Sequence, residues 1–350
     1  MIPTASQDRP ITPRAEEYIG TPDFGDVPAE FEALRSKCGV YGLELRAKAS
    51  LTGSDRVRWL NGIVTNNVRD LGVGSGVYAF VLNPQGRILG DLYAYNRGDS
   101  LLVDTDRFQL QKVLELFDHY IIMDDVEVND NSDKLSAVGI AGPEARTALA
   151  NAGLEFPELP PLNLVDATWR NVPLTVVRGD SPVVPSYELW APPENIASLR
   201  GALRNNGIRP VGATAIGLLR IAQGVPQFGK DIRERDLPQE TGQQRALHFT
   251  KGCYIGQEIV ERIRSRGNVH RMFTGFKVDG PLPEPGTKIN VEGKDVGEIT
   301  SAASLPLANG PYLVALGYIR REIAMTAMPI PMNGTNLNVT TLPFSEVFQH

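Results

Sequence analysis

Residues 251–258 read KGCYIGQE, and this stretch carries more information than any other in the 350-residue chain. Gly252 and Gly256 stand on either side of the Cys253-Tyr254-Ile255 run. Glycine permits a tight turn or a close approach of the backbone to another group. We expect a helix to begin after Gly256. The stretch therefore predicts a tight loop that carries one thiol and leads into a helix.

The thiol of Cys253 is a candidate reactive group. Lys251 lies two residues before it, and a nearby cation favours thiolate over thiol. The N-terminus of the expected helix adds partial positive charge. We therefore predict a catalytic or redox-sensitive Cys253 assisted by Lys251. The alternative is a small buried apolar side chain, because free cysteines are among the most buried residues.

Downstream of this loop, the chain is rich in arginine: Arg262, Arg264, Arg266 and Arg271, with His270 among them. Arginine side chains hold carboxylates and phosphates through two parallel hydrogen bonds. The alternative is a solvated helix face, partly balanced by Glu258 and Glu261. Both interpretations stay open.

Composition is that of an ordinary globular protein, with 42% hydrophobic and 22% charged residues. The net charge of −6 argues against a nucleic-acid backbone as the main, stable partner. No apolar run is long enough to span a bilayer, and residues 1–10 do not resemble a secretory leader. Two cysteines do not form a disulfide framework, so a reducing, cytoplasmic setting is expected.

The order of expected elements predicts an α+β protein. Residues 1–27 form a proline-rich arm, and residues 28–268 mix strands and helices without strict βαβ alternation. Strands are expected at 77–82 and 87–95, joined as a hairpin by the turn at residues 83–86. After a boundary near residue 268, short alternating runs predict a small antiparallel barrel or sandwich over 269–350.

Outside the 251–271 segment, the sequence offers few candidate catalytic or metal-binding residues. The histidines and cysteines lack zinc-ligand spacing, so no metal site is expected, and no phosphate-binding loop or serine nucleophile motif is present. Asp91 stands on the second hairpin strand among apolar neighbours. Its carboxylate is either exposed on one strand face or held in a pocket. In a pocket it can accept a hydrogen bond from a heterocyclic amine or take a proton.

The KGCYIGQE stretch resembles the K-G-C-Y-x-G-Q-E signature of the YgfZ-type folate-binding proteins. These are relatives of the glycine-cleavage T-protein, an aminomethyltransferase. Residues 51–68, 82–95 and 218–240 also resemble segments of this family, and the resemblance covers roughly residues 30–345. It implies a three-lobed α+β body around a central cavity for tetrahydrofolate, with a C-terminal antiparallel β-barrel.

The resemblance also implies roles for single residues. Asp91 takes the position of an aspartate that faces the reactive amine region of folate, and Glu240 that of a glutamate that holds the pterin. Tyr254 and Arg262 are added to the expected folate-binding set from the residues themselves and not from the resemblance, since the arginines suit a polyglutamate tail. Cys253, Asp91 and Lys251 form the expected catalytic set.

This chain departs from the T-protein pattern at several positions. Cys253 replaces an acidic residue, and Ala222 and Gly217 replace glutamates. These replacements weigh against a complete aminomethyl-transfer site. They favour the YgfZ-type branch, which is linked to maturation or repair of iron–sulfur enzymes and, less directly, to tRNA thiomethylation. Iron–sulfur client or assembly proteins are then the expected partners.

Two other functions stay open at this point. One is an aminomethyltransferase that passes a one-carbon unit to tetrahydrofolate. The other is a scaffold without catalytic activity.

Overall fold

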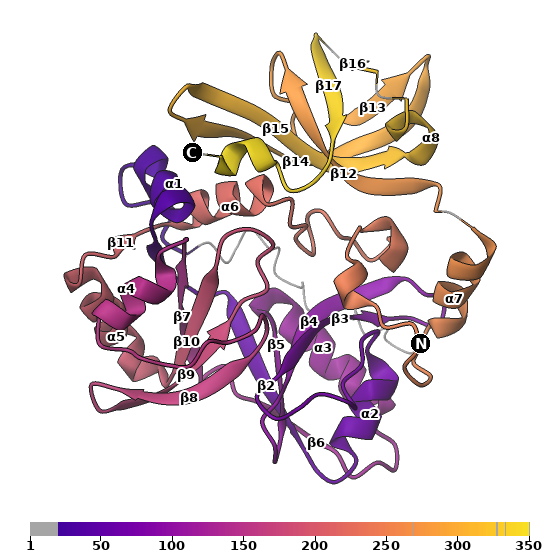
Figure 1. Ribbon diagram of the computed structural model, residues 1–350. Coiled ribbons are helices and arrows are strands. Elements are labelled where there is room, and N and C mark those ends of the chain that lie inside the picture. Colours follow the sequence, from indigo (N-terminus) through magenta and orange to yellow (C-terminus); the bar gives the residue numbers. More distant parts are fainter. Residues whose placement is uncertain (1–19, 268, 327, 333, 350) are drawn as a thin grey trace, which may run out of the picture.

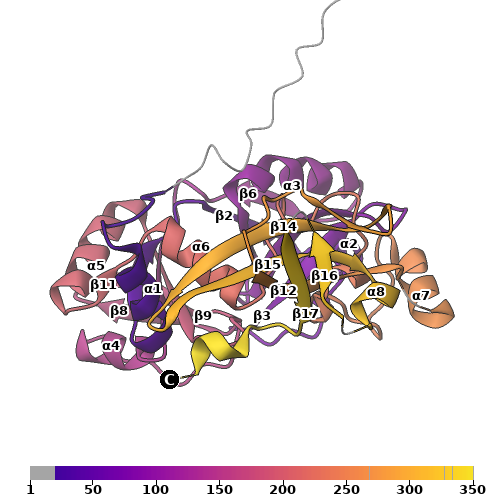
Figure 2. The ribbon, with the colours of Figure 1, turned by 90° about the horizontal axis from the view of Figure 1, so that it is seen from above.

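The computed structural model describes residues 20–349, except 268, 327 and 333. Most of the expected N-terminal arm therefore lies outside the described residues. Three sheets organise these described residues, and Figure 1 shows them as three bodies, with the sheet built from the C-terminal part above the other two. Seen from above in Figure 2, this third sheet lies across the other two bodies.

The first sheet is antiparallel and has five strands in the order β3-β4-β5-β2-β6. Their bounds are Gly76–Leu82 (β3), Ile88–Asn96 (β4), Leu101–Asp106 (β5), Arg46–Thr52 (β2) and Glu127–Asp130 (β6). Helices α2 (Arg56–Ile63) and α3 (Arg107–Tyr120) contribute to the apolar core of this body. Because side chains alternate along a strand, Leu92 and Ala94 enter that core while Asp91, Tyr93 and Tyr95 share the opposite face.

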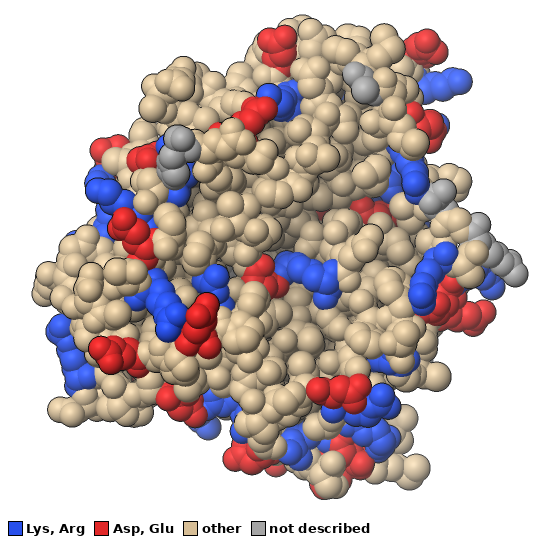
Figure 3. All heavy atoms as spheres, viewed as in Figure 1, with Lys and Arg blue, Asp and Glu red and all other residues tan. Residues whose placement is uncertain are grey.

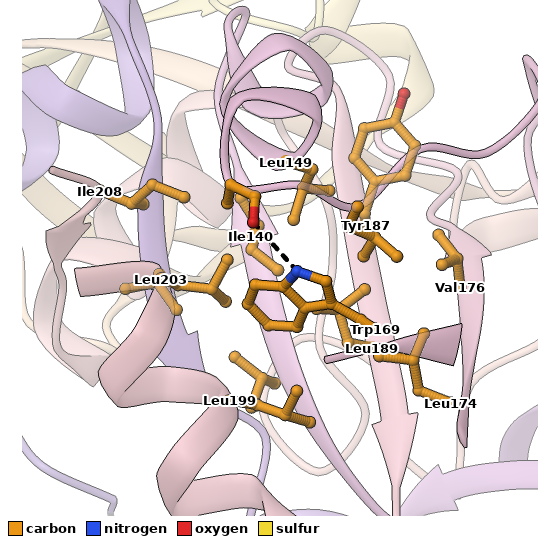
Figure 4. Close-up of a cluster of buried hydrophobic side chains, with 14 of the residues drawn as sticks. Ile140, Leu149, Trp169, Leu174, Val176, Tyr187, Leu189, Leu199, Leu203 and Ile208 are labelled. Atoms are coloured by element: carbon orange, nitrogen blue, oxygen red, sulfur yellow. Dashed lines mark hydrogen bonds between the residues drawn. The ribbon is translucent and has the colours of Figure 1, made fainter. Parts of the chain in front are cut away.

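The second sheet has six strands in the order β11-β1-β7-β10-β9-β8. Their bounds are Arg209–Pro210 (β11), Gly39–Gly42 (β1), Ser136–Ala141 (β7), Ser186–Ala191 (β10), Val172–Arg178 (β9) and Leu164–Trp169 (β8). Helices α4 (Ala145–Asn151) and α5 (Pro193–Asn205) complete its core. Figure 4 shows Trp169 at the centre of this core, where its indole N–H donates to the carbonyl of Ala152 at 3.0 Å.

The segment after the first helix contains two strands that belong to different sheets. Strand β1 pairs with β7 in the second sheet, and β2 pairs with β5 in the first. Only residues 43–45 separate the two strands. The first two sheets are thus joined by a very short connection.

The third sheet is antiparallel and has the strand order β13-β14-β15-β12-β17-β16. Its edge strands β13 and β16 approach each other, so the sheet is nearly closed and barrel-like. The bounds are Lys288–Val291 (β13), Lys294–Leu307 (β14), Gly310–Arg320 (β15), Arg271–Asp279 (β12), Thr335–Thr340 (β17) and Ile330–Met332 (β16). The described part of the chain has a mixed α and β composition, as its sequence predicts.

Helices α1 (Val27–Ser36) and α6 (Ala213–Ala222) connect the third sheet to the rest of the molecule. Phe31 and Leu34 of α1 and Leu219 of α6 share one apolar cluster with Leu305 of β14 and Leu316 of β15. The remaining helices are α7 (Gln257–Arg266), α8 (Arg321–Ala324) and the single turns η2 (Pro238–Glu240), η3 (Gln244–Ala246) and η4 (Ser345–Phe348). Among the described residues, no helix is long and apolar enough to cross a membrane.

Candidate functional site

Two adjoining cavities lie where the three bodies meet. The inner cavity, of about 300 Å³, lies between the facing sides of the first two sheets. The outer cavity, of about 750 Å³, is bounded by the 241–245 segment, the start of β12 and residues 339–343. Both are lined by a common set of residues, Asp180, Pro182, Gln223, Val225 and Arg245. The two cavities therefore form one candidate binding region. Figure 3 shows acidic and basic side chains interspersed over the face of the molecule that is seen in Figure 1.

Charged and aromatic side chains line the inner cavity. Tyr93 and Tyr95 lie side by side on β4, with ring centroids 6.5 Å apart. Arg46 of β2 lies over Tyr93 and forms ion pairs with Asp104, at 3.2 Å, and Asp106, at 2.7 Å. A flat, polar heterocycle suits such a wall, because aromatic faces stack and fixed charges orient polar edges.

Glu188 supplies a carboxylate from the opposite sheet. It lines the inner cavity from β10, and its Oε2 accepts the Trp190 indole N–H at 2.6 Å. Oε1 has no hydrogen-bond partner among the described residues. Burial, reinforced by the nearby charge of Asp104, raises the pKa of Glu188. Glu188 is thus a partly satisfied carboxylate in a cavity wall, which is the kind of group that binds a ligand with N–H donors.

Behind this wall lies a buried ion pair. The Lys48 ammonium is 3.4 Å from Asp104 Oδ1 and lies over the Trp190 ring at 4.7 Å. Both Lys48 and Asp104 are almost fully buried. Because a buried charge is costly to leave unpaired, the pair fixes the first sheet against Trp190 of the second.

Asp91 lies beside this region. Its carboxylate accepts the Tyr78 hydroxyl at 2.6 Å and the Gln109 side-chain amide at 2.8 Å. Asp91 is not among the residues that line either cavity. Arg245, which lines both cavities, lies over the Tyr78 ring at 4.4 Å. Asp91 is therefore separated from the cavity-lining Arg245 by Tyr78, which lines neither cavity itself.

Arg245 connects the two cavities electrostatically. Its guanidinium forms an ion pair with Asp180, whose carboxylate also accepts the Tyr93 hydroxyl at 3.3 Å. Burial raises the pKa of Tyr78, and the neighbouring Asp91 carboxylate raises it further. The phenol therefore stays protonated at neutral pH and acts as a donor.

Lys251 holds the 251–258 loop against the first body. Its ammonium donates to the carbonyls of Asn61, Val64 and Asn66 at 2.5, 2.6 and 2.7 Å. Burial lowers the pKa of Lys251 to about 7, with a smaller contribution from the charge of Arg69, whereas three carbonyl acceptors favour the charged form. The side chain is an internal clamp, and no hydrogen bond joins its ammonium to Cys253.

A steric constraint requires glycine at position 256, just before α7. Gly256 has φ +79°, and a Cβ there would lie 2.6 Å from the carbonyl oxygen of Asn83. The loop therefore packs against the turn of the β3–β4 hairpin, and α7 starts directly after it, as the sequence predicts.

Cys253 is exposed on this loop. The alternative of a buried, inert cysteine is therefore excluded for Cys253, whereas Cys38 is buried. Neither of the two cavities includes Cys253 among its lining residues. The thiol faces solvent, and its reactivity stays a prediction.

Glu240 contributes to a clamp between the body and the third sheet. Its carboxylate accepts from Arg271 of β12 at 2.9 Å, and Arg271 also pairs with Asp236 at 2.7 Å. Glu240 is buried and lines neither cavity. The structure thus gives it a structural partner where the resemblance implied a pterin contact.

Arg262 and Tyr254 also lie apart from the two cavities. The Arg262 side chain is 56% exposed on α7 and pairs with Glu258 at 3.5 Å. Helix α7 lies at the outer edge of the molecule in Figures 1 and 2. Tyr254 is buried in an apolar cluster with Tyr78 and Phe80, and burial raises its pKa to about 12.

The expected site residues thus fall into separate places. Asp91 lies behind Tyr78 and outside both cavity linings, Lys251 and Tyr254 anchor the loop, Cys253 faces solvent, and Glu240 joins two bodies. The cavity-lining residues Arg46, Asp180, Glu188 and Arg245 were missed. Glu188 offered one signal, a single carboxylate in the strand sequence SYELWA. Among the described residues, no group of three or more His, Cys, Asp and Glu side chains could hold a metal ion.

Comparisons with known proteins match this architecture. A family model described as the GCVT N-terminal domain matches residues 12–251. An aminomethyltransferase of Rubrobacter xylanophilus is 26% identical, over 98% of this chain and 93% of the relative. A putative chloroplastic transferase of Arabidopsis thaliana is also 26% identical, over 86% of this chain and 69% of the relative.

The fold is also found in a solved structure, the glycine cleavage system aminomethyltransferase T from Bartonella henselae. The TM-score is 0.81 and the identity 21%, over 91% of this chain and 89% of that one. Because the family model covers more than half of the sequence, the chain belongs to the GCVT N-terminal domain family, that of the glycine-cleavage T-protein.

Proposed function

We propose that this protein binds tetrahydrofolate in the two adjoining cavities. The observation that carries the proposal is the partly satisfied Glu188 carboxylate in an inner cavity walled by Tyr93, Tyr95 and Arg46. A pterin has a flat ring and an edge of N–H donors. Such a ring suits the aromatic wall, and the donors suit a carboxylate.

The outer cavity extends this fit. Arg245 lines both cavities, and its guanidinium suits the carboxylates of the glutamate part of the ligand. Tetrahydrofolate, when bound, would supply the one-carbon carrier. The contribution of this chain would be to orient the ring and to hold a proton on Tyr78 beside the Asp91 carboxylate.

Titration of the full-length protein with tetrahydrofolate tests this proposal. We expect Glu188→Gln to weaken binding by about tenfold or more, since hydrogen bonds to a charged acceptor are lost. Glu194→Gln, an exposed carboxylate on α5, is the matched control and should leave the affinity unchanged. Absence of binding to the unmodified protein, or equal effects of the two substitutions, would contradict the proposal and favour a scaffold.

We further propose that the folate-bound protein acts on iron–sulfur client or assembly proteins through Cys253. The support is the exposed thiol on the KGCYIGQE loop, where a large partner can reach it. Cys253→Ser should abolish support of a cluster-dependent enzyme in cells while tetrahydrofolate affinity is retained. A fully active Cys253→Ser protein would show that the thiol has no such role.

The second candidate is aminomethyl transfer to tetrahydrofolate. It is favoured by the names of the relatives and by the hydrogen-bonded Asp91 next to the cavity wall. Formation of methylenetetrahydrofolate from an aminomethylated lipoyl carrier protein, lost in Asp91→Ala, would support this candidate. Binding without any turnover would leave the first proposal in place.

A further inference from the structure

A second, highly charged groove lies away from the two central cavities. It has a volume of about 590 Å³, and every residue that lines it is charged: Arg87, Arg235, Arg271, Lys288 and Glu298. Arg87 follows the turn of the β3–β4 hairpin, Arg235 precedes η2, and the other three come from β12, β13 and β14. Three distant parts of the sequence thus bring four cations to one hollow.

The carboxylates around this groove do not balance its cations. Glu298 pairs with Lys288, Arg233 and Arg235, at 2.6, 2.6 and 3.3 Å. Arg271 pairs with Asp236 and Glu240. Five cations, counting Arg233, therefore face three carboxylates, which leaves two positive charges in excess. This excess occurs in a protein whose net charge is −6.

Two of these arginines have unused donors. Arg87 makes no ion pair with a carboxylate among the described residues, and it donates to the carbonyl of Arg235 at 2.6 Å. The Nε and Nη2 atoms of Arg233 are buried without a hydrogen-bond partner in the described part of the chain. Arg87 is exposed and lines the groove, so its free donors can reach an anionic ligand there, whereas Arg233 is not among the lining residues.

Strand β12 separates this groove from the folate region. Arg271 lines the groove, whereas its neighbour Met272 lines the outer cavity. Successive side chains of a strand point to opposite faces, so a ligand in one hollow does not occupy the other. The groove is thus independent of the proposed folate site.

We propose that this groove binds the phosphoryl group of a small phosphorylated molecule. A phosphate monoester carries a charge of about −1.5 to −2 at neutral pH and three acceptor oxygens. That charge matches the excess of two positive charges, and arginine forks bind phosphate through paired hydrogen bonds. A single carboxylate would leave one positive charge unbalanced.

Calorimetric titration of the full-length protein, at fixed ionic strength, tests this site. The probes are inorganic phosphate and adenosine monophosphate, which distinguish a free phosphate from a phosphate ester. We expect saturable binding that Arg87→Gln or Lys288→Gln weakens by about tenfold or more. Arg262→Gln on α7 removes the same charge outside the groove and should have little effect.

Two further variants should change the phosphate affinity in other ways, one by raising it and one by lowering it less than Arg87→Gln does. Glu298→Gln removes the competing carboxylate and should tighten binding. Arg87→Lys keeps the charge but loses the fork, and should fall between Arg87→Gln and the unmodified protein. Circular dichroism of each variant confirms that it is folded, and Arg235→Gln replaces any variant that is not.

The proposal is wrong if neither probe binds below about 10 mM, which corresponds to a very weak interaction. It is also wrong if Arg262→Gln weakens binding as much as Arg87→Gln, since the effect would then be one of overall charge. Loss of phosphate binding in Glu188→Gln would assign the anion to the central cavities instead. Tetrahydrofolate affinity should stay unchanged in Arg87→Gln, so the two sites can fail separately.

Discussion

At the residue scale, Lys251 uses its ammonium to hold the 251–258 loop on the first body of the molecule. The spacing to Cys253 suggested that this cation acts on the thiol. In the structure, its ammonium lies inside a set of three carbonyls from residues 61–66, while Cys253 faces solvent. The two residues are close in sequence and lie in one loop, but their spacing does not show in which direction each side chain points.

Replacement of Lys251 should therefore act on stability. Lys251→Met leaves three buried carbonyls without their donor, and we expect a loss of about 2–4 kcal/mol in the free energy of unfolding. Cys253→Ser, an exposed change in the same loop, should stay within about 0.5 kcal/mol. Urea unfolding measures both. An unchanged midpoint for Lys251→Met would show that the carbonyl contacts contribute nothing.

Glu240 shows the same limit of sequence reasoning. Its segment resembles a family motif, so a role could be predicted from the motif. Its partner, Arg271, lies 31 residues further along the chain. Glu188, on the other hand, lines the cavity because two sheets face each other, and no local pattern in the sequence reports that contact.

At the element scale, the strands and helices with clear boundaries were predictable. The β3–β4 hairpin follows from alternating apolar residues on either side of an Asn-Pro-Gln-Gly turn. Strand β8 was missed, because LVDATW alternates only weakly and is partly exposed. Asp106 is the N-cap residue of α3, yet its carboxylate pairs with Arg46 and no side-chain cap bond forms.

The contact of β14 with the 233–235 segment should depend on pH. Burial tends to raise the pKa of Glu298, but hydrogen bonds from Lys288 and Arg233, together with their charges, lower it below its usual value of 4.5. The ionised carboxylate thus stabilises the folded state above the pKa of the unfolded chain. This contribution is lost as the pH falls through the lower folded pKa.

The measurement is urea unfolding of the unmodified protein and of Glu298→Gln from about pH 6 to about pH 3. The unmodified protein should be the more stable of the two near pH 6, and the difference should shrink as the pH falls. A difference that is constant across this range would show that the ion pairs of Glu298 do not contribute. Its partners Lys288 and Arg235 are largely exposed, so added salt should also reduce the difference.

At the scale of the whole molecule, the composition and the order of elements predicted a mixed α and β protein with a C-terminal antiparallel sheet. They could not predict how the three bodies are joined. That arrangement depends on contacts such as those of Phe31 and Leu219 with Leu305 and Leu316, between helices α1 and α6 and the third sheet. Residues from both ends of the chain build this cluster.

The third sheet should therefore be needed for the fold of the remainder. A chain that ends at residue 267 exposes the apolar faces of α1 and α6, including Phe31, Leu34 and Leu219. We expect it to lose near-ultraviolet circular dichroism and to bind a hydrophobic dye while it keeps much of its secondary structure. A truncated chain with the cooperative unfolding transition of a packed protein would contradict this expectation.

The three-residue connection between β1 and β2 has a consequence for how a ligand enters the inner cavity. Residues 43–45 span at most about 11 Å even when fully extended. They therefore hold the first and second sheets close together where β1 and β2 meet. The two sheets cannot separate widely at this edge. We therefore expect a ligand of the inner cavity to enter through the adjoining outer cavity, past residues 241–245 and 339–343.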